Sequence, residues 1–253
     1  MVKWKLMLTT LPYVAAVLIA KLVLSEVFHF RGVVEFSEVG LVLTGGIFLV
    51  GFMLAGTMAD FKESERLPAE IACTLETIEE TLAIAAVSKA LDPAPLRRGV
   101  SDLLQAITQW LYRKRSHAEL FAALEAFTVY PQQIEKAGAG GYASRALSET
   151  HNLRKMLTRV GVISRTGFLA SGYALLETLV GAIISLLLIA SFRSVLAQSI
   201  LCSFVTLVYV YMLRLIRDID DPFEYDEAGA KGAAEVELFP ISEYAERLRS
   251  RLR

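Results

Sequence analysis

The sequence predicts an all-α membrane protein in which four transmembrane helices are joined to a helical cytoplasmic domain, inserted between spans 2 and 3. Two observations lead to this prediction. Hydrophobic residues make up 54% of the 253-residue chain and the mean hydropathy is +0.46, whereas soluble proteins keep more charge on their surfaces. In addition, four segments contain the run of about 20 mostly apolar residues with which a helix crosses a bilayer.

The predicted spans cover residues of about 6–28, 39–59, 166–192 and 194–213. The second and fourth contain no charged residue, whereas the first contains Lys21 and Glu26 and the third contains Glu177. A charged side chain inside a bilayer is costly and often functional, so Lys21 and Glu177 are candidate functional residues. Lys21 can extend outward toward Glu26, and Glu177 either bonds a neighbouring helix or faces a water-filled crevice.

The basic residues predict the orientation of the spans. The only basic residues in the short links after the first and third spans are Arg31 and Arg193. Cytoplasmic loops are enriched in Lys and Arg, so these two links are expected on the outer side. We therefore expect both termini in the cytoplasm and the chain in a cell membrane, most simply a bacterial inner membrane. The expected regions are transmembrane helices 1 and 2 (1–59), a cytoplasmic helical region (60–165), transmembrane helices 3 and 4 (166–214) and a cytoplasmic tail (215–253).

The stretch between the second and third spans shows the apolar periodicity of helices and no strand-like alternation. Pro68 is expected in the first turn of the first of these helices, which stops at Pro93. Ser116 and Glu119 form a capping box that begins a later helix, and glycines around Gly138 precede the last one. Near the C-terminus a short helix needs a partner surface for its apolar side chains, which are Tyr244, Leu248 and Leu252.

The second span has an unusual face of small and aromatic residues. Phe48 and Phe52 are four residues apart and therefore lie on one side of the helix, with Thr44 one turn earlier. Glycines that let helices approach closely accompany them, and these are Gly45, Gly51 and Gly56. If several copies of this helix surround an axis, the Phe rings form a hydrophobic constriction of the kind that gates by dewetting. Ordinary close packing in a four-helix core is the alternative.

Acidic residues follow the second span directly. Asp60 and Glu63 would form rings of carboxylates at the inner mouth of an oligomer, and such rings favour cations. The alternative is a solvated helix end, where Lys62 and Arg66 partly neutralise the acids.

No constellation of residues indicates an enzyme. The three histidines, His29, His117 and His151, are scattered without ligand spacing, and no metalloprotease, nucleophile-elbow or phosphate-loop motif is present. The net charge of −1 gives no basic field for nucleic acid. We therefore expect a protein that is not an enzyme.

Short motifs around the spans resemble those of the bestrophin family, including its divergent prokaryotic branch of bestrophin-like domain proteins. Phe-x-x-Gly-Phe at residues 48–52 and Arg-Leu-Pro at residues 66–68, with Phe61 between them, resemble the bestrophin neck helix and cytoplasmic entry. Asp-Asp-Pro-Phe-Glu at residues 220–224 resembles the family's Pro-Phe signature with acidic neighbours. Leu-Phe-Pro-Ile at residues 238–241 is similar to its later Leu-Pro-Leu element.

The resemblance implies a homopentameric ion channel whose pore is lined by the second span, with Phe48, Phe52 and Thr44 as its neck. The family default is an anion such as chloride. Asp60 and Phe61 stand where many bestrophins have an Arg-Trp pair, so conduction of monovalent cations is the second possibility. Lipid and permeant ions are then the other expected partners.

Calcium is the one cofactor that the resemblance suggests, and it would bind in the tail. The candidate residues for gating or calcium binding are Asp220, Asp221 and Glu224. A solvated acidic linker is the alternative, because calcium needs six to eight converging oxygens. Two other functions also stay open for the whole chain. One is a secondary transporter, in which Glu177 couples protons, and the other is a membrane-anchored scaffold or sensor.

Overall fold

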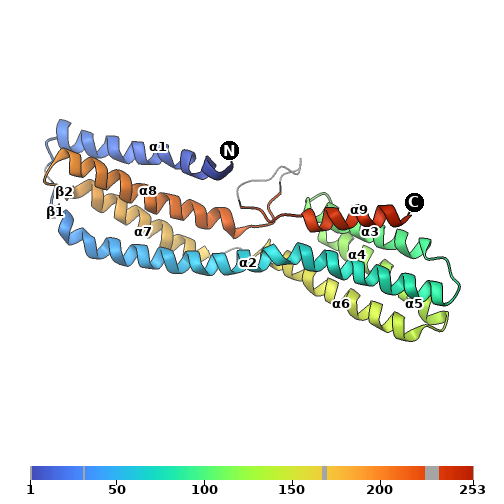
Figure 1. The fold of residues 1–253 in the computed structure, drawn as a ribbon. Coiled ribbons are helices and arrows are strands. Elements are labelled where there is room, and N and C mark those ends of the chain that lie inside the picture. Colours follow the sequence, from blue (N-terminus) through green and yellow to red (C-terminus); the bar gives the residue numbers. More distant parts are fainter. Residues whose placement is uncertain (1, 31, 167–169, 226–233, 253) are drawn as a thin grey trace. The chain divides into compact units, whose positions relative to one another are not determined.

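The computed structural model describes residues 2–30, 32–166, 170–225 and 234–252, which are almost entirely helical (Figure 1). The chain divides into two compact units. The first unit comprises Met1–Phe61 and Thr166–Asp221, and the second comprises Lys62–Arg165 and Pro222–Arg253. One helix, α2 (Phe36–Ser88), contributes residues to both units.

The first unit contains all the predicted spans, and each is long and apolar enough to cross a membrane. Its elements in chain order are α1 (Val2–Leu22), the π-helix η1 (Val23–Val27), β1 (Val34–Glu35), the first part of α2, α7 (Ala170–Ile189), β2 (Ala190–Ser191) and α8 (Val195–Asp220). The prediction of a mainly helical chain with four helices that could cross a membrane is confirmed.

The core of the first unit lies where α2, α7 and α8 meet. Val50 and Met53 of α2 pack there with Ile183 of α7 and with Cys202 and Tyr209 of α8, all of them buried. The helix α1 packs chiefly along α8. Apolar side chains therefore hold these helices together on one side of each, while their other sides stay exposed.

A short parallel strand pair was not predicted from the sequence. Val34 of β1 pairs with Ala190 of β2, and Glu35 pairs with Ser191. Gly32 precedes β1 with φ +86°, and a Cβ at this position would lie 2.6 Å from the backbone nitrogen of Ser191. Only glycine fits both this conformation and this close approach. Two residues per strand are too few to give a period-two pattern.

The second unit is a bundle of helices around the apolar face predicted for the later part of α2. Its elements are that part of α2, α3 (Ala94–Leu111), α4 (His117–Phe127), α5 (Val129–Lys136), α6 (Gly140–Ile163) and α9 (Phe239–Leu252). The apolar side chains spaced at three and four residues along α2 are almost completely buried, and these are Ile71, Leu75, Ile78 and Leu82. The capping box of Ser116 and Glu119 is present at the start of α4.

Two helix boundaries differ from the prediction. Pro68 lies inside α2 and not in the first turn of a new helix. A proline within a helix removes one backbone hydrogen bond, and here its buried ring belongs to the packed face of the bundle. A second difference is the break at Thr128, which separates α4 from α5.

The C-terminal helix α9 finds its partner surface on α3 and on the later part of α2. Tyr244 is buried, and its hydroxyl donates a hydrogen bond of 3.3 Å to the carbonyl oxygen of Leu75. Burial and the nearby carboxylates, Glu79 first among them, raise the pKa of this phenol. Glu79 is itself 1% exposed and accepts from Arg97 at 2.7 Å and from Arg251 of α9. The helix is thus held by both apolar packing and a buried ionic network.

Candidate functional site

The face of α2 that carries Thr44, Phe48 and Phe52 is exposed in the single chain. Phe48 is 76% exposed and Phe52 is 73% exposed, although both lie in the middle of an apolar span. Val50 and Met53 on the other side of the helix are buried against α7 and α8. Thr44 is also exposed, and its hydroxyl donates to the carbonyl oxygen of Gly40 at 2.9 Å. The aromatic stripe is therefore directed away from the subunit's own core.

The predicted packing glycines of α2 do not pack within the subunit. A Cβ built at Gly45, Gly51 or Gly56 would meet no atom within 4 Å outside its own stretch of helix, among the residues that the structure describes. Their predicted role in packing would therefore require another subunit, and it stays a prediction.

At Gly46 of α2 both α7 and α8 approach closely. A Cβ there would lie 2.7 Å from the hydroxyl oxygen of Tyr209 and 2.8 Å from Cδ1 of Ile183. The Tyr209 hydroxyl donates a hydrogen bond of 2.5 Å to the carbonyl oxygen of Leu43. Sequence reasoning missed this contact, because two adjacent glycines look alike until the partner helix is placed.

Lys21 is buried, with 1% exposure, and does not extend toward the interface as the sequence suggested. Its Nζ donates hydrogen bonds to the carbonyl oxygens of Leu188 at 2.9 Å and Ala190 at 2.6 Å, at the end of α7. The ammonium also lies 5.2 Å from the ring centroid of Phe192. Lys21 thus satisfies carbonyl groups that the helix end leaves without intrahelical partners, and a cation is favoured at this end of the helix dipole.

Glu177 forms an ion pair with Arg217 of α8. The Arg217 guanidinium also lies 5.8 Å from the ring centroid of Tyr173, one turn before Glu177. Of the two roles considered for Glu177, bonding to a neighbouring helix is the one observed. Lys21 and Glu177 therefore have separate partners.

The two acidic candidates after the second span have different surroundings. Asp60 is exposed at the end of the first unit's part of α2. Glu63 belongs to the second unit, where Arg159 of α6 donates to both of its oxygens at 2.8 and 2.5 Å. The hydrogen bonds from Arg159 lower the pKa of Glu63. A positive charge therefore accompanies Glu63, and this cation was not predicted.

The tail motif around Pro222 is an anchor in the second unit. Phe223 and Tyr225 are buried, and the Tyr225 hydroxyl donates to the carbonyl oxygen of Val236 at 2.7 Å. The amide of Val236 donates in turn to the carbonyl oxygen of Pro222 at 2.9 Å. Glu224, between the two aromatic residues, is exposed.

The calcium candidates are not gathered into a ligand set. Asp220 ends α8 and Asp221 follows it as the C-cap residue. Over residues 2–30, 32–166, 170–225 and 234–252, the structure contains no group of three or more His, Cys, Asp or Glu side chains placed to hold a metal ion. The neighbouring acids Asp226 and Glu227 lie outside the described residues. Calcium binding by this tail stays a prediction.

Comparisons with known proteins identify the fold. No protein-family model matches the chain, and no curated protein sequence matches it. Among solved structures, a bacterial bestrophin homologue from Klebsiella pneumoniae superposes with a TM-score of 0.78 at 14% sequence identity, covering 98% of each chain. A mutant form of that homologue gives a TM-score of 0.76 at 13% identity, covering 98% of this chain and 100% of the other. A structure described as a membrane protein gives 0.78 at 14%. The chain therefore has a bestrophin-like fold, and its four apolar helices indicate an integral membrane protein.

Proposed function

We propose that this chain, with its bestrophin-like fold, is a subunit of a homo-oligomeric ion channel whose pore is lined by the exposed face of α2. The observation that supports this most directly is the stripe of Thr44, Phe48 and Phe52, which faces away from the subunit core. In a ring of subunits the two Phe positions form successive apolar constrictions. Such constrictions control ion passage by excluding water.

The glycines beside the stripe favour a pore over a lipid-facing surface. Gly costs a helix about 1 kcal/mol relative to Ala, and a Cβ at Gly45, Gly51 or Gly56 would lie within 4 Å of no other described part of the subunit. A surface that faces lipid gains nothing from missing side chains. A pore lumen gains width, and an interface between α2 helices of neighbouring subunits gains close approach.

We also propose a membrane topology and a number of subunits for this channel. The first unit is the membrane domain, the second unit is cytoplasmic, and both termini lie on the cytoplasmic side of a bacterial inner membrane. Five subunits surround the pore. The short links after the first and third spans contain only Arg31 and Arg193, which supports this orientation.

Selectivity depends on the charges beyond the inner end of the constriction. A ring of Asp60 carboxylates favours cations. Glu63 adds little net charge because Arg159 pairs with it. We therefore propose passive conduction of monovalent ions, with chloride as the default from the resemblance and a cation as the outcome favoured by Asp60.

The test is recording from purified protein in planar bilayers under an asymmetric KCl gradient. Phe48→Ala combined with Phe52→Ala widens the constriction and is expected to raise the current at least severalfold. Phe204→Ala is the matched control, since it removes an exposed Phe from α8 of the same unit. The sign of the reversal potential assigns anion or cation selectivity. If neither the wild type nor the double variant conducts current after its insertion into the bilayer has been verified, the result contradicts the channel and favours the transporter or the scaffold.

A further inference from the structure

The first unit contains a cavity of about 450 Å³ between the start of α2 and the connection from β2 to α8. The parallel pairing of β1 with β2 holds these two segments side by side. None of the residues that line the cavity belongs to the stripe of Thr44, Phe48 and Phe52. A cavity of this size falls in the range of small-molecule sites, and the proposed pore does not account for it.

The cavity carries one acidic and one basic side chain that do not pair with each other. Glu35 ends β1, and its carboxylate accepts a hydrogen bond of 3.2 Å from the Ser37 hydroxyl. Arg193 is exposed and forms no ion pair with any residue that the structure describes. Glu38, the next acid along the chain, does not line the cavity. The lining therefore offers an acceptor for a cationic group and a separate donor for an anionic group.

An aromatic pair forms the apolar wall of the cavity. The rings of Phe36 and Phe192 have their centroids 5.1 Å apart. The ammonium of Lys21 lies 5.2 Å from the Phe192 ring, but it already donates hydrogen bonds to two carbonyl oxygens. Lys21 therefore fixes the position of this wall and does not supply a further free charge to the cavity.

The helix α8 continues from the cavity as an exposed apolar surface. Leu196, Ile200 and Phe204 are 71%, 58% and 63% exposed, and their spacing of four residues places them along one side of the helix. We call them the apolar stripe of α8. Ala197 and Leu201, which line the cavity, follow the first two of them directly in the sequence. Because α8 is long and apolar enough to cross a membrane, this stripe is suited to contact with acyl chains.

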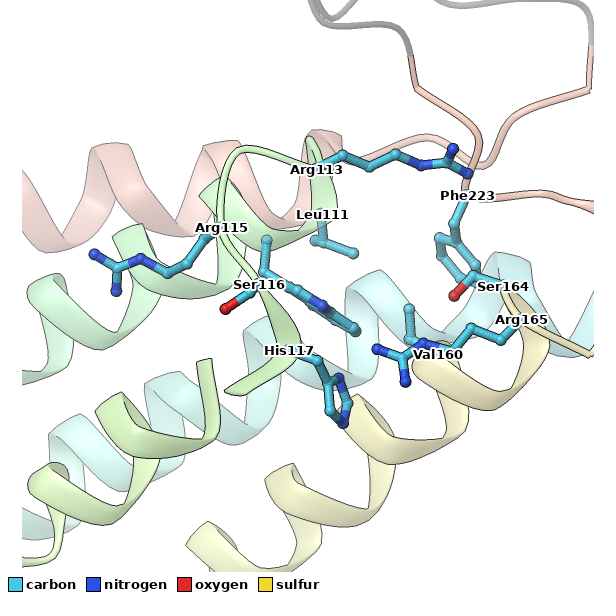
Figure 2. A pocket seen from close by; sticks show the side chains of 10 residues that line it. Leu111, Arg113, Arg115, Ser116, His117, Val160, Ser164, Arg165 and Phe223 are labelled. Carbon is cyan, nitrogen blue, oxygen red and sulfur yellow. The ribbon is translucent and has the colours of Figure 1, made fainter. Parts of the chain in front are cut away.

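A cavity of about 350 Å³ in the second unit, beside the connection between α3 and α4, differs in its charges (Figure 2). Its basic lining residues include Arg113, Arg115 and Arg165. The Glu119 carboxylate accepts hydrogen bonds from the amide and the hydroxyl of Ser116 and lies near Arg115. Arg113 also has an interaction partner. The protein itself therefore compensates positive charge at that cavity.

We propose that the cavity between β2 and α2 binds the headgroup of a phospholipid that carries a primary ammonium. The ammonium donates to the Glu35 carboxylate, the phosphate accepts from the Arg193 guanidinium, and the acyl chains lie along the apolar stripe of α8. Guanidinium groups match the geometry of phosphate oxygens, and hydrogen bonds between charged groups are stronger than neutral ones. The proposal does not depend on ion conduction, and its test requires no current.

The test is native mass spectrometry of the purified protein in detergent, titrated separately with three lipids of identical acyl chains. Phosphatidylethanolamine is expected to bind about tenfold more tightly than phosphatidylcholine, whose quaternary ammonium cannot donate a hydrogen bond. It should exceed phosphatidylglycerol by a similar factor, because that headgroup has no cation for Glu35. Free phosphoethanolamine lacks the acyl chains and is expected to bind more weakly than the lipid, on the order of a hundredfold.

Two substitutions separate the charges of the site. Glu35→Gln should abolish the preference for phosphatidylethanolamine over phosphatidylcholine, whereas Arg193→Gln should weaken the binding of both lipids about tenfold. Glu38→Gln is the matched control, since it removes an exposed acid three residues later that does not line the cavity, and it should keep the preference. The preference is a ratio measured within one protein, so a variant of lower stability still reports it.

Four outcomes would overturn the proposal. They are equal binding of the three lipids by the wild type, tightest binding of phosphatidylglycerol, binding of free phosphoethanolamine as tight as that of the lipid, and a preference that survives Glu35→Gln.

Discussion

Two adjacent glycines of α2 are expected to respond oppositely to the same substitution. At Gly46 a Cβ would lie 2.7 Å from the Tyr209 hydroxyl and 2.8 Å from Cδ1 of Ile183, whereas at Gly45 it would meet nothing within 4 Å. Ala gains about 1 kcal/mol of helix propensity over Gly at either position. Any difference between the two variants therefore reports the contact at Gly46.

The cost at Gly46 follows from how its neighbours are held. Tyr209 is 1% exposed and its hydroxyl is bonded to the carbonyl of Leu43, and Ile183 is fully buried, so neither tip has free space. Overpacking of this kind costs about 1–3 kcal/mol, and displacing the Tyr209 hydrogen bond costs about 1 kcal/mol more. After the propensity gain, Gly46→Ala is expected to destabilise the subunit by about 1–3 kcal/mol, whereas Gly45→Ala is neutral or stabilising for the fold of the single subunit.

The assay is reversible denaturant unfolding in detergent of the two variants and of Tyr209→Phe with and without Gly46→Ala. Removing the hydroxyl relieves the closest contact, so Gly46→Ala should cost less in the Tyr209→Phe protein, a coupling that a double-mutant cycle measures. Equal stability of the Gly45→Ala and Gly46→Ala proteins would refute the reasoning. So would a cost that is unchanged by Tyr209→Phe.

Three further substitutions or conditions test the other buried polar contacts. Lys21→Met should destabilise the first unit by about 1–3 kcal/mol in unfolding experiments, because the carbonyls at the end of α7 lose their donor, whereas the exposed Lys5→Met is the neutral control. Arg251→Ala leaves the buried carboxylate of Glu79 with one cation fewer and should cost about 2 kcal/mol, seen as faster hydrogen exchange in α9. Acidification should also loosen α9. The hydrogen bond from Arg247 lowers the pKa of Glu76 in the folded protein. The stability that Glu76 contributes is therefore fully present above its unfolded pKa of about 4.3 and is lost as the pH falls through the lower folded value. Hydrogen exchange in α9 that does not change with pH across this window would contradict the prediction.

Most of the architecture could be predicted from the sequence, because it depends on two kinds of hydrophobic pattern. Long apolar runs defined the four spans, and the three- and four-residue spacing of Ile71, Leu75 and Ile78 defined the core of the second unit. The capping box at Ser116 could also be predicted, because its hydrogen bonds join residues close in sequence. Each of these signals lies within one helix.

The contacts between distant segments could not be predicted. Lys21 bonds to carbonyls more than 160 positions later in the chain, and nothing in the residues around Lys21 distinguishes such a partner from water at the interface. Pro68 looked like a helix start, because the local rule for proline does not include the packing that keeps α2 continuous. Gly46 and Gly45 could be told apart only once α8 was placed.

The candidate site was also predictable only where its residues lie on one helix. The positions of Phe48 and Phe52 on one helix face followed from their spacing, and both are exposed as a lining role requires. The cavity lined by Arg113, Arg115, Arg165 and His117 was missed, because its arginines come from the α3–α4 connection and from the segment that follows α6. Its only local sign was the cluster Arg113-Lys114-Arg115 just before the helix.

The bonding of Lys21 also has a consequence for biosynthesis. Its acceptors, the carbonyls of Leu188 and Ala190, lie 167 and 169 residues downstream. At roughly 5–20 residues per second of synthesis, the first span waits on the order of ten to thirty seconds before these acceptors exist. During that interval the ammonium group of Lys21 lies within the span without these acceptors, at a cost below the roughly 2.5–3.5 kcal/mol of a charge at the centre of a membrane helix. The nascent chain is therefore most vulnerable before α7 emerges, and a membrane insertase or chaperone that shelters α1 would act in this window.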